Sequence, residues 1–210
     1  MSQRIALFGG SFDPIHRGHL IVARSVAERV PLEKIIFLPS ASPPHKQGEA
    51  LADPSHRAAM VALAIQGETQ PCQFEMSDFD LTRTGPSYTI DTVEHFRRTL
   101  GDEVELHWII GADSLNELTG WHRVAALVDG CQLLTASRPG SDAIDWTSLR
   151  SALSESQIEK LRRGVMETPR IDISSTDVRR RVQQDQSILR LVPDSVAHYI
   201  QEHSLYHTHA

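Results

Sequence analysis

The sequence predicts an α/β fold: a doubly wound parallel sheet with helices on both faces and a small C-terminal helical part. Short apolar runs alternate with helical patterns along most of the chain, and a strand, a helix and a second strand fit within the first 39 residues. Such βαβ units place their two strands parallel, with a right-handed crossover. The chain has 210 residues, a length at which one α/β domain is common, so we expect a single domain over residues 1–210.

The individual elements follow from the spacing of apolar residues and from the glycines and prolines between them. Short runs rich in β-branched or aromatic side chains indicate buried strands, and apolar residues recurring on one helical face indicate helices. Gly9 and Gly10 end the first run, and Pro31 ends the first helical pattern. In chain order we expect a strand at Arg4–Phe8, a helix at Gly18–Val30, a strand at Lys34–Pro39, a helix at Ser55–Ile65, a strand at Gln73–Leu81, a helix at Thr89–Leu100, and strands at His107–Gly111 and Cys131–Ala136.

The C-terminal third is more charged. An amphipathic pattern predicts a helix from Trp146 to Arg162, within a segment that we interpret as a peripheral insertion. RIDI, from Arg170 to Ile173, predicts one more strand. SSTDVRRRV then opens a helix and VPDSVAHYIQEH forms a last one, so we place a C-terminal helical portion at about residues 174–205.

Composition and charge exclude several classes of protein. The formal net charge is −6, from 21 basic and 27 acidic residues, which disfavours a general electrostatic grip on nucleic acid. No segment has the apolar length of a membrane span, and the N-terminus lacks the apolar region of a secretory signal. The two cysteines, Cys72 and Cys131, are far apart in apolar runs, as is usual for reduced thiols. We therefore expect a cytoplasmic protein without a nucleic-acid or membrane partner.

Three polar connections follow predicted strands. They are SASPPHKQGEALADP after Leu38, TRTGPSY after Leu81 and ADSLNELTGW after Gly111. In an open parallel sheet, ligands bind beyond the carboxyl ends of the strands, near the point where the strand order reverses. These connections are therefore candidates for a binding site.

The stretch GGSFDPIHRGHL, which follows the first strand, has the outline of an anion site. Gly9 and Gly10 let an anion approach the backbone, and the helix that follows offers unpaired N–H groups. His16 and His19 lie one helical turn apart, so both rings can reach one ligand. A tight strand exit would also explain the glycines. A zinc site would need further ligands, and the chain has no Cys pair or H-E-x-x-H motif.

ISSTDVRRR, from Ile173 to Arg181, presents a second helix start of this kind. Ser174 or Ser175 can cap the helix, and an acidic residue in the first turn favours its positive end. That is all an ordinary cap requires. Arg179 lies one turn further on, however, where its guanidinium and the hydroxyls of Ser175 and Thr176 could converge on phosphate oxygens.

These two stretches together resemble the nucleotidyltransferase superfamily, whose signatures are (H/T)xGH after the first strand and ISSTxxR near the C-terminus. SPPHK, GPSYTIDT, WIIGADSL, Trp121 and SRPG are further similar to the bacterial nicotinate-mononucleotide adenylyltransferases. The resemblance covers nearly the whole chain and is weakest from Ser141 to Thr168. It implies a Rossmann-like fold and the transfer of AMP from ATP to nicotinate mononucleotide, which gives nicotinic acid adenine dinucleotide and pyrophosphate in NAD biosynthesis.

The resemblance also implies which residues form the site. The expected catalytic residues are His16, His19 and Arg179. The expected ATP-binding residues are Gly9, Gly10, Ser11, Phe12, His16, His19, Gly111, Asp113, Arg138, Ser175, Thr176 and Arg179. The expected mononucleotide-binding residues are His45, Lys46, Tyr88, Thr89, Trp121 and His122. Mg²⁺ is expected on the ATP phosphates, without dedicated metal ligands on the protein.

Two other functions remain alternatives. One is another adenylyl- or cytidylyltransferase of the same superfamily, acting for example on phosphopantetheine; SPPHK, GPSYT and Trp121 argue against it. The other is a regulatory module that binds a nucleotide without catalysis, against which the intact His16, His19 and Arg179 argue. The sequence is compatible with a homo-oligomer but does not specify one.

Overall fold

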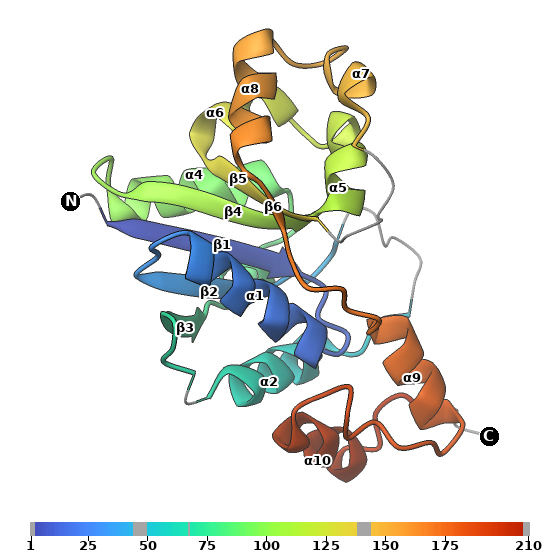
Figure 1. The fold of residues 1–210 in the computed structure, drawn as a ribbon. Coiled ribbons are helices and arrows are strands. Elements are labelled where there is room, and N and C mark those ends of the chain that lie inside the picture. Colours follow the sequence, from blue (N-terminus) through green and yellow to red (C-terminus); the bar gives the residue numbers. More distant parts are fainter. Residues whose placement is uncertain (1–2, 44–49, 67, 138–143, 208–210) are drawn as a thin grey trace.

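A six-stranded parallel sheet forms the centre of the molecule (Figure 1), in a computed structural model that describes residues 3–43, 50–66, 68–137 and 144–207. The strands lie in the order β3-β2-β1-β4-β5-β6, and every neighbouring pair is parallel. Their bounds are β1 Arg4–Gly10, β2 Lys34–Pro39, β3 Gln73–Met76, β4 Glu105–Gly111, β5 Gln132–Ser137 and β6 Val165–Glu167. This is the strand order of the Rossmann-like doubly wound fold, so the predicted fold class is confirmed.

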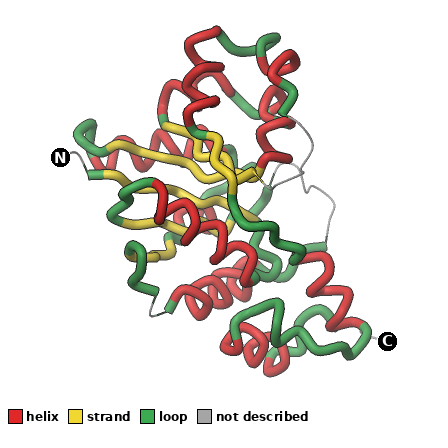
Figure 2. The backbone as a smooth tube through the Cα atoms, viewed as in Figure 1, coloured by secondary structure: helices red, strands yellow, loops and turns green. Residues whose placement is uncertain are grey.

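Helices cover both faces of the sheet (Figures 1 and 2), because successive strand residues point to opposite sides. In β1, Ala6 and Phe8 belong to one hydrophobic core, and Ile5 and Leu7 to the other. The first core is covered by α1 Arg17–Arg29, α2 Pro54–Ile65, α9 Ser175–Gln183 and α10 Asp194–Glu202. The second is covered by α4 Thr89–Leu100, α5 Ala112–Asn116, α6 Val124–Gly130, α7 Trp146–Leu149 and α8 Glu155–Arg163.

The order of the strands locates the place where a ligand is expected. From β1 the chain builds β2 and β3 toward one edge of the sheet, and it then returns to add β4, β5 and β6 on the other side of β1. The direction of winding thus changes between β1 and β4. The crevice at the carboxyl ends of these two strands is the usual ligand site of such folds.

Most of the expected elements are present, two of them with the expected bounds: β2 at Lys34–Pro39 and α4 at Thr89–Leu100. The strand expected at Gln73–Leu81 is too long. β3 ends at Met76, and a short helix, α3 Phe79–Thr82, follows. The Oγ of Ser77 accepts a hydrogen bond from the backbone N–H of Phe79 at 3.3 Å, which favours the helical turn over a longer strand.

The expected strand at Arg170–Ile173 is wrong, because this segment pairs with no strand in the described part of the chain. Ile171 is buried, with its Cγ2 beside Gly18 of α1, while Arg170 and Asp172 are exposed. The segment therefore packs against a helix and not into the sheet. The strand that pairs with β5 at the edge of the sheet is the three-residue β6, slightly upstream.

The helix expected from Trp146 to Arg162 is two helices, α7 and α8. Ser154 divides them, because its side chain caps α8 and forms a capping box with Gln157. Among the helices that the structure describes, none has the length and apolar character needed to cross a bilayer.

Candidate active site

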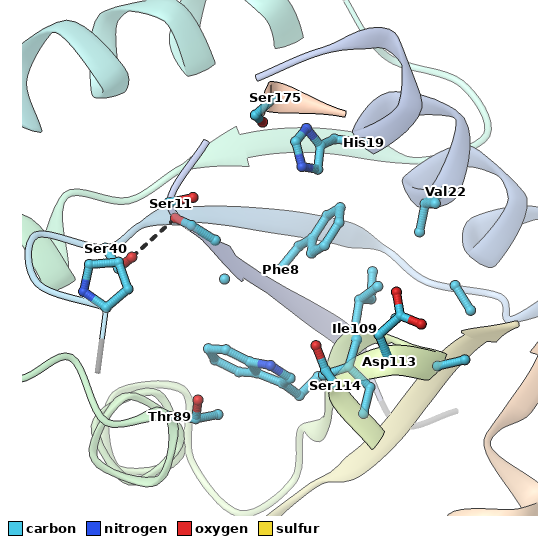
Figure 3. A pocket seen from close by; sticks show the side chains of 18 of the residues that line it. Phe8, Ser11, His19, Val22, Ser40, Thr89, Ile109, Asp113, Ser114 and Ser175 are labelled. Atoms are coloured by element: carbon cyan, nitrogen blue, oxygen red, sulfur yellow. Dashed lines mark hydrogen bonds between the residues drawn. The ribbon is translucent and has the colours of Figure 1, made fainter. Parts of the chain in front are cut away.

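A cavity of about 630 Å³ opens at the carboxyl ends of β1 and β4, at the reversal of the strand order. Its volume is typical of small-molecule sites. Figure 3 shows His19 from α1, Thr89 from α4, Asp113 from α5 and Ser175 from α9 around it. The expected site residues that line it are Gly9, Gly10, Ser11, His16, His19, Tyr88, Thr89, Gly111, Asp113, Trp121, His122 and Ser175.

At the start of α1 the rings of His16 and His19 stack on each other. His16 is the N-cap residue and His19 the third residue of the helix. Their ring centroids are 3.7 Å apart and the ring planes differ by 21°. The backbone N–H of His16 donates to Nδ1 of His19 at 3.2 Å. Because Nδ1 accepts this bond, a neutral His19 carries its proton on Nε2 and can donate it.

Removal from water lowers the pKa of His19 well below its usual 6.5, and the neighbouring His16 lowers this pKa further. His19 is therefore a neutral donor at neutral pH. An anion bound beside it would favour the charged form and raise the pKa again. The histidine pair can thus respond to the arrival of negative charge.

Packing at the β1 exit leaves little room for a side chain at Gly9 and makes one at Gly10 tight. A Cβ on Gly9 would lie 2.5 Å from Cζ2 of Trp108, and one on Gly10 would lie 3.1 Å from the ring of Phe12. Trp108 comes from β4 and lines the cavity. The strand exit is therefore tight, and the same glycines leave the backbone beside the cavity uncovered.

The start of α9 faces the same cavity and is fastened to the loop before α1. Ser174 caps the helix, accepting from the N–H of Asp177 at 3.1 Å. Ser175 Oγ donates to the carbonyl of Pro14 at 2.9 Å. Nη1 of Arg179 donates to the carbonyl of Asp13 at 2.7 Å. The two helix starts, distant in sequence, are thereby brought into direct contact.

Several expected ATP contacts do not form part of the cavity wall. Phe12 is buried in the core, Thr176 is exposed, and the Arg179 side chain lies on Asp13. None of the three lines the cavity. Arg138 lies outside the described residues, as do His45 and Lys46, which were expected at the mononucleotide.

Another part of the cavity wall consists of aromatic side chains, Tyr88, Trp121 and His122. The rings of Tyr88 and His122 stack with centroids 4.4 Å apart. Trp121 lies beside them, just after a short 3₁₀ helix at Leu118–Gly120. Arg123 follows with a left-handed φ of 52°, and its side chain pairs with Glu94 of α4 at 2.8 Å. These contacts fix the loop that presents Trp121.

Sequence reasoning missed two residues that shape this cavity. Trp108 becomes recognisable only once β1 and β4 are known to be neighbours. Asp80 is buried and lines the cavity; its Oδ1 accepts from Oγ1 of Thr92 at 2.8 Å, and burial raises its pKa. Asp80 lay in a segment read as a strand, so nothing in its sequence context singled it out.

Arg57 of α2 was also missed. It is 0% exposed, and its guanidinium donates to the main-chain carbonyls of Ala52, Ser11 and Ser40 at 2.9, 2.7 and 2.7 Å. It thus ties together the loops that follow β1 and β2. An arginine within the apolar pattern of α2 was the only signal in the sequence.

Comparison with known proteins identifies the family. The cytidylyltransferase-like family matches residues 7–181. A protein of Dehalococcoides mccartyi named "Probable nicotinate-nucleotide adenylyltransferase" is 37% identical over 207 residues, which are 99% of this chain and 98% of that protein. A protein of Moorella thermoacetica with the same name is 39% identical over 204 residues, 97% of this chain and 91% of that protein. The chain belongs to the nicotinate-nucleotide adenylyltransferases.

A solved structure shares the fold. The Plasmodium falciparum nicotinic acid mononucleotide adenylyltransferase complexed with NaAD superposes with a TM-score of 0.74 over 97% of each chain, at 19% sequence identity. At this level of identity the agreement concerns the fold alone. Within the described part of the chain, no group of three or more His, Cys, Asp or Glu side chains could hold a metal ion.

Proposed function

We propose that this protein transfers AMP from ATP to nicotinate mononucleotide, forming nicotinic acid adenine dinucleotide and pyrophosphate as a step of NAD biosynthesis. The observation that carries the proposal is the meeting of two helix N-termini, with His16, His19 and Ser175, in one cavity at the β1–β4 reversal. The positive ends of helix dipoles favour phosphate at such positions. Family membership supports the choice of substrates.

The reaction needs alignment and charge stabilisation more than a base. A phosphate monoester with a second pKa of about 6 is mostly dianionic at neutral pH, so the mononucleotide phosphate can attack the α-phosphorus of ATP directly. The bond to the pyrophosphate oxygen breaks as the new P–O bond forms. The protein must hold two polyanions in line and stabilise the charge that develops on the phosphoryl oxygens.

His16, His19 and Arg179 are the proposed catalytic residues. A neutral His19 with its proton on Nε2 can donate to a phosphoryl oxygen, and its lowered pKa can rise as negative charge accumulates there. His16 stacks on His19 and lines the same cavity. Arg179, one turn into α9, would bind the β and γ phosphates when ATP is present.

The remaining proposed ATP contacts come from the loops and helix starts that follow β1 and β4, and from the start of α9. Asp113 would accept from the ribose hydroxyls, because it lies in the first turn of α5, directly after β4, and lines the cavity. Backbone groups near the strand exit and the hydroxyls of α9 would complete the site. The residues concerned are Gly9, Gly10, Ser11, Phe12, Gly111, Ser175 and Thr176, with Arg138 in the SRPG stretch.

The mononucleotide is proposed to bind at the aromatic wall. Trp121 would stack on the pyridine ring, and the backbone amides near Thr89 and His122 would bind the carboxylate. Thr89 begins α4, where unpaired N–H groups are available. Tyr88, stacked on His122, would hold this wall in place, and His45 and Lys46 would contact the mononucleotide phosphate.

Magnesium is proposed as a companion of ATP. Mg²⁺ usually bridges phosphate oxygens and keeps several waters. We further propose that residues 1–210 act as one domain, because α10 packs in the same core as α1 and α2. The net charge of −6 supports small-molecule substrates without a nucleic-acid partner, and the buried free thiols of Cys72 and Cys131 support a cytoplasmic location.

The test is to incubate the purified protein with ATP and Mg²⁺ and to offer nicotinate mononucleotide, nicotinamide mononucleotide or phosphopantetheine in turn. Pyrophosphate release should be fastest with nicotinate mononucleotide. Release only with phosphopantetheine would contradict the proposed substrate and favour another transferase of the superfamily. ATP binding without release in any of the three reactions would favour a regulatory module.

A further inference from the structure

The C-terminal segment contacts the loop that precedes the two histidines. The hydroxyl of Tyr206 donates to Oδ1 of Asp13 at 2.8 Å, across 193 positions of sequence. Tyr206 follows α10, and its ring packs against the same core as α1 and α2. Asp13 lies between the cavity-lining Ser11 and His16. The end of the described chain is thus connected directly to the site.

Asp13 is a buried carboxylate whose bonding is incomplete. The residue is 0% exposed. Its Oδ1 accepts from Tyr206 and, at 3.2 Å, from the backbone N–H of Ala52. Its Oδ2 accepts no hydrogen bond from the described residues and lies 3.5 Å from Nη1 of Arg179. A buried charge is costly unless it is paired and hydrogen-bonded, so each of these donors matters.

Arg179 is held by the main chain of the same aspartate and not by its carboxylate. Its Nη1 donates to the main-chain carbonyl of Asp13 at 2.7 Å, a shorter contact than the 3.5 Å to the carboxylate. Nε and Nη2 make no hydrogen bond with the described residues, and the side chain is 21% exposed. These nitrogens are therefore available to an anion as long as the guanidinium stays on the carbonyl.

One further charged group, the guanidinium of Arg57, faces this cluster. Arg57 is close enough to Asp13 and Tyr206 to interact electrostatically with both, and it is occupied by the carbonyls that it binds. Burial and the Asp13 charge raise the pKa of Tyr206 well above its usual value of 10, so the phenol remains a donor at every physiological pH. The arrangement contains one buried carboxylate, two guanidinium groups and one neutral hydroxyl.

We propose that Tyr206 is a positioning residue for ATP: its hydroxyl satisfies the Asp13 carboxylate and so leaves the Arg179 guanidinium for the triphosphate. Without that hydroxyl, Oδ1 keeps only the Ala52 N–H, and the carboxylate draws Arg179 from the main-chain carbonyl into a closed ion pair. ATP must then compete with Asp13 for the guanidinium. The inference rests on the proposed function in one respect, namely that ATP is the ligand of Arg179.

The test compares Tyr206→Phe with Tyr199→Phe. Each removes one hydroxyl and keeps the ring. Tyr199 is the matched control because it lies on α10, packs against the same core, and has its hydroxyl 3.0 Å from Nδ1 of His56 rather than on Asp13. We expect Tyr206→Phe to weaken ATP binding about tenfold, the usual effect of losing a hydrogen bond to a charged group. Tyr199→Phe should stay within about twofold of the wild type.

Calorimetric titration with ATP and steady-state kinetics both provide the readout. Tyr206→Phe should raise the Kd and KM for ATP and leave the KM for nicotinate mononucleotide unchanged. In an Arg179→Ala background, Tyr206→Phe should have no further effect on ATP affinity, because the group through which it acts is gone. A merely structural loss would reduce affinity by the same factor in both backgrounds.

Three results would overturn the inference: wild-type ATP affinity in Tyr206→Phe, an equal loss in Tyr199→Phe, or an undiminished effect in the Arg179→Ala background. The proposed function fails separately. A wild-type protein that binds ATP but releases no pyrophosphate with nicotinate mononucleotide would contradict that function, while the ATP affinities of the variants would still decide the role of Tyr206. A wild-type protein that binds no ATP would contradict both.

Discussion

The two helix starts that meet in the cavity are built in different ways. At α1, His16 and His19 contact each other within one turn, by ring stacking and by the bond from the His16 N–H. At α9, Ser175 and Arg179 are bound to Pro14 and Asp13, 161 and 166 positions away. The first arrangement follows from local sequence, and the second exists only in the folded chain. We therefore expect substitutions at the start of α1 to lower kcat, and substitutions at the start of α9 to weaken ATP binding.

The largest effect is expected from His19→Ala. Removing one donor to developing charge typically costs about 10²–10³-fold in kcat, and ATP binding should change little, because the contact strengthens in the transition state. Single-turnover and steady-state kinetics measure this split. His198→Ala, on the exposed face of α10, is the control. Unchanged turnover in His19→Ala would remove this residue from the mechanism.

An intermediate effect is expected at α9, where two adjacent serines have different partners. Ser174→Ala removes the helix cap and should lower the free energy of unfolding by about 1 kcal/mol. Ser175→Ala removes the bond to Pro14 and should raise the KM for ATP about threefold to tenfold, the effect of one lost hydrogen bond. Urea denaturation and initial rates separate the two. If both variants changed only stability, the link from α9 to Pro14 would have no role in ATP binding.

The smallest effect is the pH dependence of stability at His19. Its pKa is lowered from 6.5 in the folded protein, so just below pH 6.5 the unfolded chain binds a proton that the folded chain does not. The stabilisation from this position is complete above the unfolded pKa and is lost as the pH falls.

Urea unfolding of wild type and His19→Gln at about pH 7.5 and about pH 5.5 measures this effect. The free energy of unfolding of the wild type, relative to the variant, should be smaller at the lower pH. A difference that is equal at both pH values, or larger at the acidic one, would show that the His19 pKa is not lowered by folding.

Local patterns in the sequence predicted most of the fold. β2 and α4 have the expected bounds because an uninterrupted apolar run and a clear helical periodicity identify them. The strand expected at RIDI was wrong because Ile171 is buried against α1 and not in the sheet, and a short run does not distinguish the two. β6 was missed because three residues are too short to produce a pattern.

The residues that meet at the cavity were predictable where they are close together in sequence. The histidine pair and the serine cap can be read from GGSFDPIHRGHL and ISSTDVRRR. The contacts of Arg57 with Ser11, and of Tyr206 with Asp13, join residues 46 and 193 positions apart. Such contacts depend on how the elements pack, and no spacing in one sequence encodes them. For this reason the residues that orient Arg179 could be found only in the structure.

The distribution of tryptophans has a practical consequence. The chain has three: Trp108 and Trp121 line the cavity, while Trp146 lies outside its wall with the guanidinium of Arg162 4.9 Å from its ring. Two of the three intrinsic fluorophores are therefore placed where a bound nucleotide would quench them, and the third supplies a steady background. The emission of the unlabelled protein can report occupancy of the cavity in real time.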